Sequence, residues 1–339
     1  MNSPRKRTNE NSPAPICRDW VEGSNSLSLD KSVTPQFLNV PAFAKINLSL
    51  HVLSKRANGY HELDTVFQTV SLHDTLQLFA TDNPDITLSC DDRRLPIDEG
   101  NLVRRAADAL RQRFKTSRGA RIRLEKRIPT QAGLGGGSSN AAITLIALNQ
   151  LWELNATRQD LLAIAAQIGA DVPFFLFGGT ARGKGVGAEI APLTDADPKF
   201  LLIIKPNAQV NTADAYKFLD ERSLTLPNSK FILSGSRLTE IFDNAGFNAL
   251  HNDFEEIAFE LVPEISRANS ALINAGAGSA LLAGSGSAVF GVFDSEDAQR
   301  RAIQAIELET GWRVFPCKTV GRDEYQRRAA FAGDLRSEI

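Results

Sequence analysis

The chain contains few of the residues that build disulfides and metal centres. Its 339 residues include 3 cysteines and 4 histidines. The cysteines Cys17, Cys90 and Cys317 are odd in number, lie far apart and form no C-x-x-C pair. This usage argues against a disulfide-stapled secreted domain, and residues so scattered lack the ligand spacing of a structural zinc site. We therefore expect a protein of the reducing cytoplasm, and the sequence indicates no metal ligands.

An excess of one charge and long apolar runs are also missing. Lys and Arg number 38 against 40 Asp and Glu, so the formal net charge is −2. This balance predicts no strong general attraction to nucleic acid or to an anionic membrane. No apolar run approaches the roughly 20 residues of a membrane span. The length indicates roughly two domains, while the oligomeric state is not indicated.

Residues 1–36 differ in composition from the rest of the chain. They are rich in Ser, Asn and Pro, and they carry the acidic residues Glu10, Asp19, Glu22 and Asp30 among basic ones. A transit peptide is poor in acidic residues, and a secretory signal needs an apolar centre that is missing here. We expect a disordered extension without a targeting role.

Strand and helix patterns are interleaved along the remaining chain. Alternation predicts strands at residues 40–53, 64–70, 75–80, 86–89 and 120–126, and helical spacing predicts helices at residues 102–114 and 160–169. After a turn-rich stretch near residue 195, the second half is predicted to contain strands at residues 199–205, 280–283, 288–293 and 312–320, with helices near residues 212–219, 237–242, 253–261, 264–275 and 296–309. We expect an α+β fold with an N-terminal domain (37–195), a C-terminal domain (196–325) and a tail (326–339).

The densest motif is PTQAGLGGGSSNAA at residues 129–142, between a strand pattern and a helix pattern. Glycine clusters weaken regular elements, so they mark a sharp bend or a close approach to the backbone. The first N–H groups of a helix have no internal partner and carry partial positive charge. We therefore expect a cradle for phosphate groups. The alternative is a tight turn capped by Ser138 or Ser139.

This loop is neither of two common phosphate-binding loops. A Walker A loop has a lysine after its glycines, and a dinucleotide fingerprint has a third glycine where Ser138 stands. A later stretch, residues 178–185, fits G-x-x-x-x-G-K, but Gly185 replaces the hydroxyl residue that would hold magnesium. We predict a structural hairpin there.

Three motifs, PAFAKINL, PTQAGLGGGSSNAA and LAGSGSAVFG, resemble in order and spacing those of the GHMP kinases. Within that superfamily the chain resembles the 4-diphosphocytidyl-2-C-methyl-D-erythritol kinases, through KRANGYHELDTVFQTVSLHD, IGADVPFFLFGGTARGKGVG and HNDFE. The resemblance covers about residues 40–320. It implies a ribosomal-S5-like N-terminal half, a ferredoxin-like C-terminal half, and a site in the cleft between them. It also implies ATP-dependent phosphorylation of the 2-hydroxyl of a cytidine-diphosphate polyol, in non-mevalonate isoprenoid biosynthesis.

The resemblance further implies roles for particular residues. Asp171 matches the general base that takes the proton of the attacking hydroxyl, and Lys45 matches the lysine beside it, whose charge stabilises the transferring phosphoryl group. Gly284, Ser285 and Gly286 match the third motif, which braces the loop. ATP is the implied co-substrate, and Mg²⁺ is expected with it. The implied ATP-phosphate loop consists of Pro129, Thr130, Gln131, Ala132, Gly133, Leu134, Gly135, Gly136, Gly137, Ser138 and Ser139.

For the cytidine end of the substrate, Tyr60 can stack on the pyrimidine while His61 hydrogen-bonds its edge. The resemblance suggests that Tyr216 closes the other face of the base and that Asn47 orients the polyol or the diphosphate. The alternative for Tyr60 and His61 is a surface turn. For the whole chain, one alternative is a homoserine or mevalonate-type kinase, which needs no nucleobase pocket. The other is a non-catalytic ligand sensor, which does not need both Lys45 and Asp171.

Overall fold

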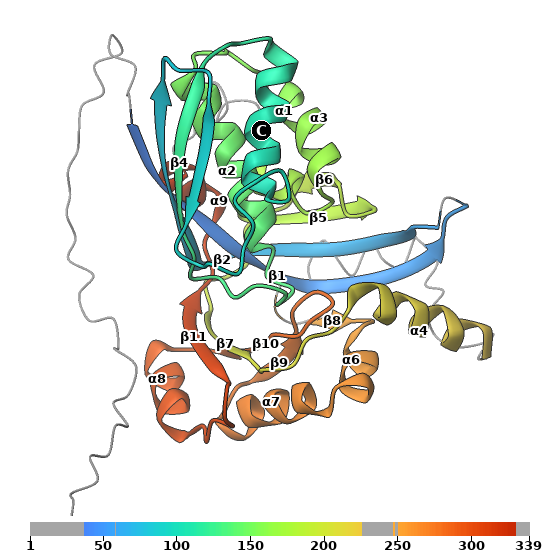
Figure 1. Ribbon diagram of the computed structural model, residues 1–339. Coiled ribbons are helices and arrows are strands. Elements are labelled where there is room, and N and C mark those ends of the chain that lie inside the picture. Colours follow the sequence, from blue (N-terminus) through green and yellow to red (C-terminus); the bar gives the residue numbers. More distant parts are fainter. Residues whose placement is uncertain (1–36, 58, 226–246, 248–249, 330–339) are drawn as a thin grey trace, which may run out of the picture. The chain divides into compact units, whose positions relative to one another are not determined.

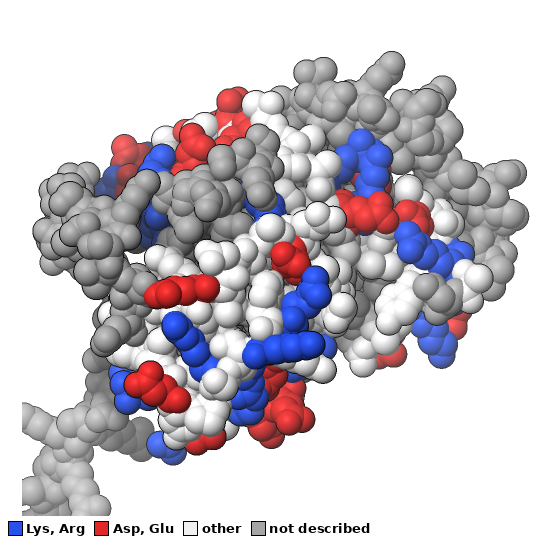
Figure 2. Space-filling model, turned by 90° about the horizontal axis from the view of Figure 1, so that it is seen from above, with Lys and Arg blue, Asp and Glu red and all other residues white. Residues whose placement is uncertain are grey.

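The computed structural model describes residues 37–57, 59–225, 247 and 250–329. The predicted extension over residues 1–36 and the predicted helix near residues 237–242 lie outside these residues, as does most of the predicted tail. Among the described helices, none combines the length and the apolar character that crossing a membrane requires. On the face shown in Figure 2, basic and acidic side chains are interspersed, in keeping with the net charge of −2.

The first sheet is built around one long antiparallel hairpin, β1 (Phe37–Lys55) and β2 (His61–Thr81). The order of the strands is β3-β4-β2-β1-β8, and β5 and β6 extend the sheet from β2. The remaining bounds are β3 (Ile86–Cys90), β4 (Gly119–Glu125), β5 (Thr180–Gly185), β6 (Glu189–Pro192) and β8 (His251–Asn252). β5 and β6 form the hairpin that we predicted for the second glycine-rich stretch.

The two strands predicted at residues 64–70 and 75–80 are one continuous strand. Phe43 pairs with His73, but the next residue, Ala44, pairs with Val70, so two residues of β2 bulge out of the ladder. A β-bulge breaks the alternation of side chains without ending the strand. The interrupted pattern therefore marks a bulge and not a turn.

Three helices and a short 3₁₀ turn cover one face of this sheet (Figure 1). They are α1 (Leu102–Phe114), α2 (Gly136–Leu151), α3 (Arg158–Ile168) and the turn Pro173–Leu176. α2 lies deepest, with apolar residues buried all round, because it packs on β1, β2 and α1 at once. α3 begins with a capping box, in which Thr157 and Asp160 bond reciprocally.

The second sheet has the order β11-β7-β10-β9, and all its pairs are antiparallel. Its strands are β7 (Phe200–Lys205), β9 (Ser279–Leu282), β10 (Val289–Phe293) and β11 (Arg313–Lys318). The helices are α4 (Thr212–Thr225), α6 (Glu255–Leu261), α7 (Pro263–Asn274) and α8 (Glu296–Ala305). This β-α-β-β-α-β succession confirms the expected ferredoxin-like half and, with the first sheet, the α+β class.

After β11 the chain returns to the first sheet and forms a helix that we did not predict, α9 (Arg322–Arg328). Tyr325 is fully buried, and its hydroxyl donates to the carbonyl oxygen of Phe175 at 2.6 Å. Residues 326–328 of the predicted tail continue this helix, and the tail boundary at residue 326 stays a prediction. The boundary predicted at residues 195 and 196 falls between β6 and β7, and the division into two domains there stays a prediction.

Candidate active site

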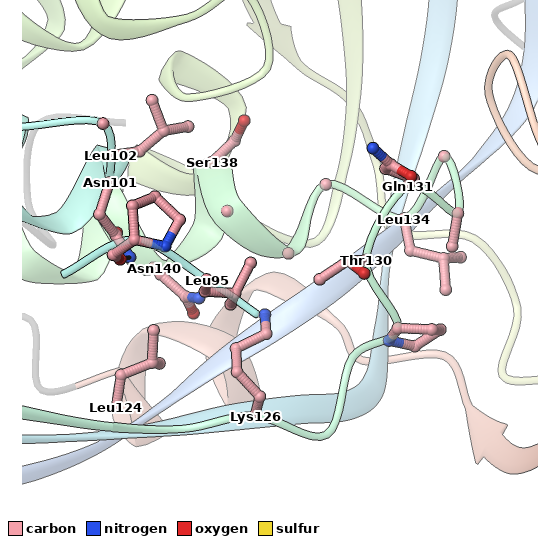
Figure 3. Close-up of a pocket in the computed structure, with 18 residues that line it drawn as sticks. Leu95, Asn101, Leu102, Leu124, Lys126, Thr130, Gln131, Leu134, Ser138 and Asn140 are labelled. Carbon is pink, nitrogen blue, oxygen red and sulfur yellow. Dashed lines mark hydrogen bonds between the residues drawn. The ribbon is translucent and has the colours of Figure 1, made fainter. Parts of the chain in front are cut away.

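The glycine-rich loop ends at the first turn of α2. Gly135 caps this helix in the left-handed conformation, with φ at 68°, and no side chain accepts from the first N–H groups. A turn capped by Ser138 or Ser139 is therefore not what forms. The unpartnered N–H groups lie beside a cavity of about 390 Å³ (Figure 3). This arrangement suits an anionic ligand.

The cavity is lined by ten of the eleven predicted loop residues, and Ser139 is the exception. Ser139 is fully buried, and its hydroxyl has no hydrogen-bond partner among the described residues. The neighbouring Ser138 does line the cavity, opposite Lys126 and Leu124 in Figure 3. Of the two serines, Ser138 is the one exposed to a ligand.

Lys126 brings a positive charge to this cavity that the sequence analysis did not find. It follows β4, and its ammonium contacts the carboxylate of Asp74. Asp74 is fully buried and also accepts the backbone N–H groups of Arg127 and Ile128, at 2.7 and 2.8 Å. Asp74 thus fixes the chain that enters the loop and orients Lys126. No motif marks this lysine, because its place depends on a partner 52 residues earlier.

The third motif holds the loop from the other side. A Cβ on Gly133 would lie 1.8 Å from the carbonyl oxygen of Ala283, and one on Gly284 would lie 3.0 Å from the carbonyl oxygen of Gly133. Both glycines have positive φ, of 75° and 57°. The backbone N–H of Ala288 also donates to Ala132. The two glycine-rich stretches therefore pack backbone against backbone, which a side chain at Gly133 would prevent.

A second cavity, of about 330 Å³, adjoins the first, and Gly133 and Ser138 line both. Lys45 and Asp171 meet in it, with the Lys45 ammonium 3.4 Å from an Asp171 carboxylate oxygen. The Lys45 side chain is only 4% exposed, whereas that of Asp171 is 34% exposed. The carboxylate of Asp171 is thus accessible from the second cavity.

A chain of hydrogen bonds positions the ammonium of Lys45. It donates to Asn47 at 2.8 Å, Asn47 donates to Thr65 at 2.7 Å, and Thr65 donates to the carbonyl of Ser49 at 2.6 Å. The three side chains come from the β1–β2 hairpin, and the backbone N–H of Lys45 donates to Leu134 of the loop. Asn47 lines the second cavity and accepts from the ammonium of Lys45, and its role in orienting the polyol or the diphosphate stays a prediction.

The predicted base-binding residues lie in an arrangement that the sequence did not suggest. His61 stacks on Tyr216, with ring centroids 4.5 Å apart, and its Nε2 lies 2.7 Å from Asp220. Tyr216 lines the second cavity and packs edge-on against Phe254. Neither His61 nor Tyr60 lines that cavity, and Tyr60 is 65% exposed. The structure thus brings together His61 and Tyr216 but not Tyr60.

Burial and neighbouring charges determine the protonation states of Tyr216 and Asp220. Burial, and to a lesser extent the charge of Asp171, raises the pKa of Tyr216 to about 12, so the phenol stays neutral. Burial also acts to raise the pKa of Asp220, but hydrogen bonds from Lys55 and His61 outweigh it and leave that pKa lowered. Asp220 is therefore a carboxylate that accepts from His61, which places a proton on Nε2.

Comparisons with known proteins agree with this geometry. Family models described as the GHMP kinases N-terminal domain and GHMP kinases C-terminal match residues 101–179 and 232–310. A 4-diphosphocytidyl-2-C-methyl-D-erythritol kinase of Chlorobium phaeobacteroides is 39% identical over 82% of this chain and 93% of its own length. A solved 4-(cytidine 5′-diphospho)-2C-methyl-D-erythritol kinase is 35% identical, with a TM-score of 0.69 over 84% of this chain and all of that one. A homoserine kinase from Cytophaga hutchinsonii shares the fold at 21% identity, with a TM-score of 0.63 over 86% of this chain and 97% of that one.

Proposed function

The chain belongs to the GHMP kinase family, and we propose that it transfers the γ-phosphoryl group of ATP to the 2-hydroxyl of 4-diphosphocytidyl-2-C-methyl-D-erythritol. The observation that carries this proposal is the pairing of Lys45 with Asp171 in the second cavity, which adjoins the cavity of the glycine-rich loop. The identity of 39% to a curated kinase of that name supports the choice of substrate. A non-catalytic sensor has no need of this ion pair, and the homoserine kinase at 21% identity supports the fold alone. A cytoplasmic location stays a prediction.

In this proposal the loop and Lys126 hold the phosphates of ATP in the first cavity. The N–H groups at the start of α2 donate to the phosphate oxygens, and Lys126 adds a charge from the opposite side. The acceptor hydroxyl lies in the second cavity, beside Asp171, and is presented to the γ-phosphate near Gly133 and Ser138. Asp171 takes the proton of the hydroxyl as its oxygen attacks, and Lys45 stabilises the charge on the transferring group.

The expected Mg²⁺ fits the hydroxyl oxygen of Ser138 at the start of α2. Ser138 lines both cavities, whereas Ser139 lines neither. Hydroxyl oxygens and substrate phosphates are ligands that Mg²⁺ accepts. When bound there, Mg²⁺ would neutralise phosphate charge.

For the nucleobase, Tyr216 offers a face for stacking and His61 offers a hydrogen-bond acceptor. When Nε2–H of His61 donates to Asp220, the neutral form of the imidazole has its lone pair on Nδ1. A lone pair can accept from the exocyclic amino group of cytosine, but it cannot satisfy the carbonyl that uracil carries at that position. We propose that Tyr60 completes the site by covering the base, which would bury its exposed ring.

A direct assay tests the substrate. The purified chain is incubated with Mg²⁺, ATP and, in parallel, the cytidylated methylerythritol, homoserine or mevalonate, and phosphorylated products are measured by ³¹P NMR. We expect turnover only with the cytidylated substrate. Faster turnover of homoserine or mevalonate would replace this substrate assignment while keeping the kinase class.

The contact between the two glycine motifs gives a prediction for Gly133→Ala. The new Cβ must displace the backbone at Ala283, and alanine is strained at positive φ. We expect the free energy of unfolding to fall by about 1–3 kcal/mol, and kcat/KM for ATP to fall about ten- to a hundred-fold because the loop is displaced. Urea denaturation and steady-state kinetics measure the two effects. Gly278→Ala is the control, since its Cβ meets no atom closer than 3.8 Å, and equal behaviour of the two variants would contradict the packing argument.

The base pocket gives a prediction for Tyr216→Leu and Tyr60→Leu. Stacking of a base on an aromatic ring is worth about 1–3 kcal/mol in single-strand binding proteins. We therefore expect Tyr216→Leu to raise the KM for the cytidylated substrate about ten- to a hundred-fold, with the KM for ATP unchanged. A similar rise in Tyr60→Leu would show that Tyr60 covers the base. If neither variant changes this KM, the cytidine pocket lies elsewhere.

A further inference from the structure

A second group of polar side chains lies outside both cavities, where β1 meets β8. His51, His251 and Asp253 each offer one nitrogen or oxygen atom, and these three atoms all lie within 4.8 Å of one another. Two of the four histidines of the chain are thus gathered beside one carboxylate. None of the three belongs to the catalytic arrangement described above.

Strand pairing fixes this arrangement. Ser49 and Leu50 of β1 pair in parallel with His251 and Asn252 of β8, so His51 comes next to Asp253. The backbone N–H of Asp253 donates to the carbonyl of Leu50, and one carboxylate oxygen accepts from the N–H of Val52 at 2.7 Å. The backbone of β1 therefore orients the carboxylate from both sides.

The other carboxylate oxygen of Asp253 lies 2.7 Å from Nε2 of His251, and the rings of His251 and His51 are stacked with centroids 4.5 Å apart. Glu255 and Glu256 follow Asp253 closely in the chain, and their negative charges favour a cation at this position.

We propose that His51, His251 and Asp253 bind a divalent transition metal ion of the Zn²⁺ type. Two imidazoles and one carboxylate are a ligand set typical of Zn²⁺, with water at the fourth position. Mg²⁺ prefers an all-oxygen shell, so this site is distinct from that of the expected catalytic ion. The metal replaces the proton between His251 and Asp253, which is released to solvent. Ligand atoms of a tetrahedral site lie about 3.3 Å apart for Zn–N bonds of about 2.0–2.1 Å. The three side chains must therefore rotate to bring their ligand atoms closer together than they lie here.

Such an ion would join two parts of the chain that are 200 residues apart, from His51 to His251. The neighbouring residues Leu50 and Phe254 line the second cavity, and Asn252 donates to the carbonyl of Gly284 in the third motif. The metal would therefore stabilise the pairing of β1 with β8, which forms one wall of the acceptor cavity. A ligand that binds only the folded chain raises its melting temperature.

Titration of the full-length, tag-free chain with Co²⁺, followed by visible absorption, tests the site. We expect ligand-field bands that saturate at one Co²⁺ per chain, that Zn²⁺ bleaches and that excess Mg²⁺ does not. Zn²⁺ should also raise the Tm of the wild type. His251→Gln should weaken Co²⁺ binding at least about ten-fold, a size typical of altered metal-site residues. Its side chain is half exposed, so the fold should tolerate the change.

Two further variants keep the test decisive. His251→Cys should retain binding, because a thiolate is a zinc ligand and glutamine is not. His73→Gln, which alters a described histidine outside the cluster, should bind like the wild type. The proposal is overturned if the wild type shows no saturable Co²⁺ bands, or if the bands persist in a His51→Gln, His251→Gln double variant. A wild type without Co²⁺ bands would leave the kinase proposal unchanged, since that proposal uses neither His51 nor His251.

Discussion

Asp171→Asn is expected to lower kcat by about two to four orders of magnitude, the range usual for loss of a general base. The amide keeps the shape of the carboxylate but cannot take the proton of the attacking hydroxyl. The side chain is one-third exposed and faces the second cavity, so the fold should tolerate the change. Steady-state kinetics measure the loss, and calorimetric titration with a non-hydrolysable ATP analogue should show nucleotide binding close to that of the wild type.

The surface pair Lys199–Asp294 supplies a matched control for this variant. Its atoms are 2.7 Å apart, and Asp294 is almost fully exposed. Asp294→Asn removes the same charge from a lysine partner and should leave kcat unchanged. If Asp171→Asn keeps kcat within a few-fold of the wild type, Asp171 is not the base.

Lys45→Met is expected to lower kcat about a hundred- to a thousand-fold, the loss typical of removing one group that stabilises transition-state charge. Methionine keeps the length of the buried side chain but removes the ammonium, which contacts Asp171 and donates to Asn47. Because Asn47 loses its donor, the free energy of unfolding should fall by about 1–3 kcal/mol. Steady-state kinetics measure the loss of kcat, and urea denaturation measures the fall in the free energy of unfolding.

Lys199→Met controls for the substitution, since it breaks an ion pair at the surface, where such pairs contribute little to stability. The double variant Lys45→Met, Asp171→Asn then tests whether the two residues act together. Groups that act as a unit show losses far smaller than the product of the single ones. Fully multiplicative losses would mean that lysine and aspartate act independently.

Local patterns were sufficient to place the glycine-rich loop on its elements, whereas the roles of Lys45 and Asp171 are implied by the family resemblance and stay predictions. The glycine-rich loop forms a sharp bend before the first turn of α2, and Asp171 follows the end of α3. Lys45 lies within β1. Lys45 and Asn47 stand two residues apart in β1, so strand alternation places them on one side of the strand. Such features depend on dihedral preference and side-chain periodicity, which act within a few residues.

Only the tertiary structure decided which distant side chains meet these motifs. Lys126 faces the loop because Asp74 holds it, and His61 is oriented by Asp220, 159 residues later in the chain. Tyr60 and His61 are neighbours in sequence, yet strand geometry sends them to different surroundings, one exposed and the other buried against Tyr216. Likewise, His51 and His251 meet only through the pairing of β1 with β8. Sequence patterns record each strand's own periodicity, whereas register and packing depend on a partner strand whose distance along the chain no local pattern encodes.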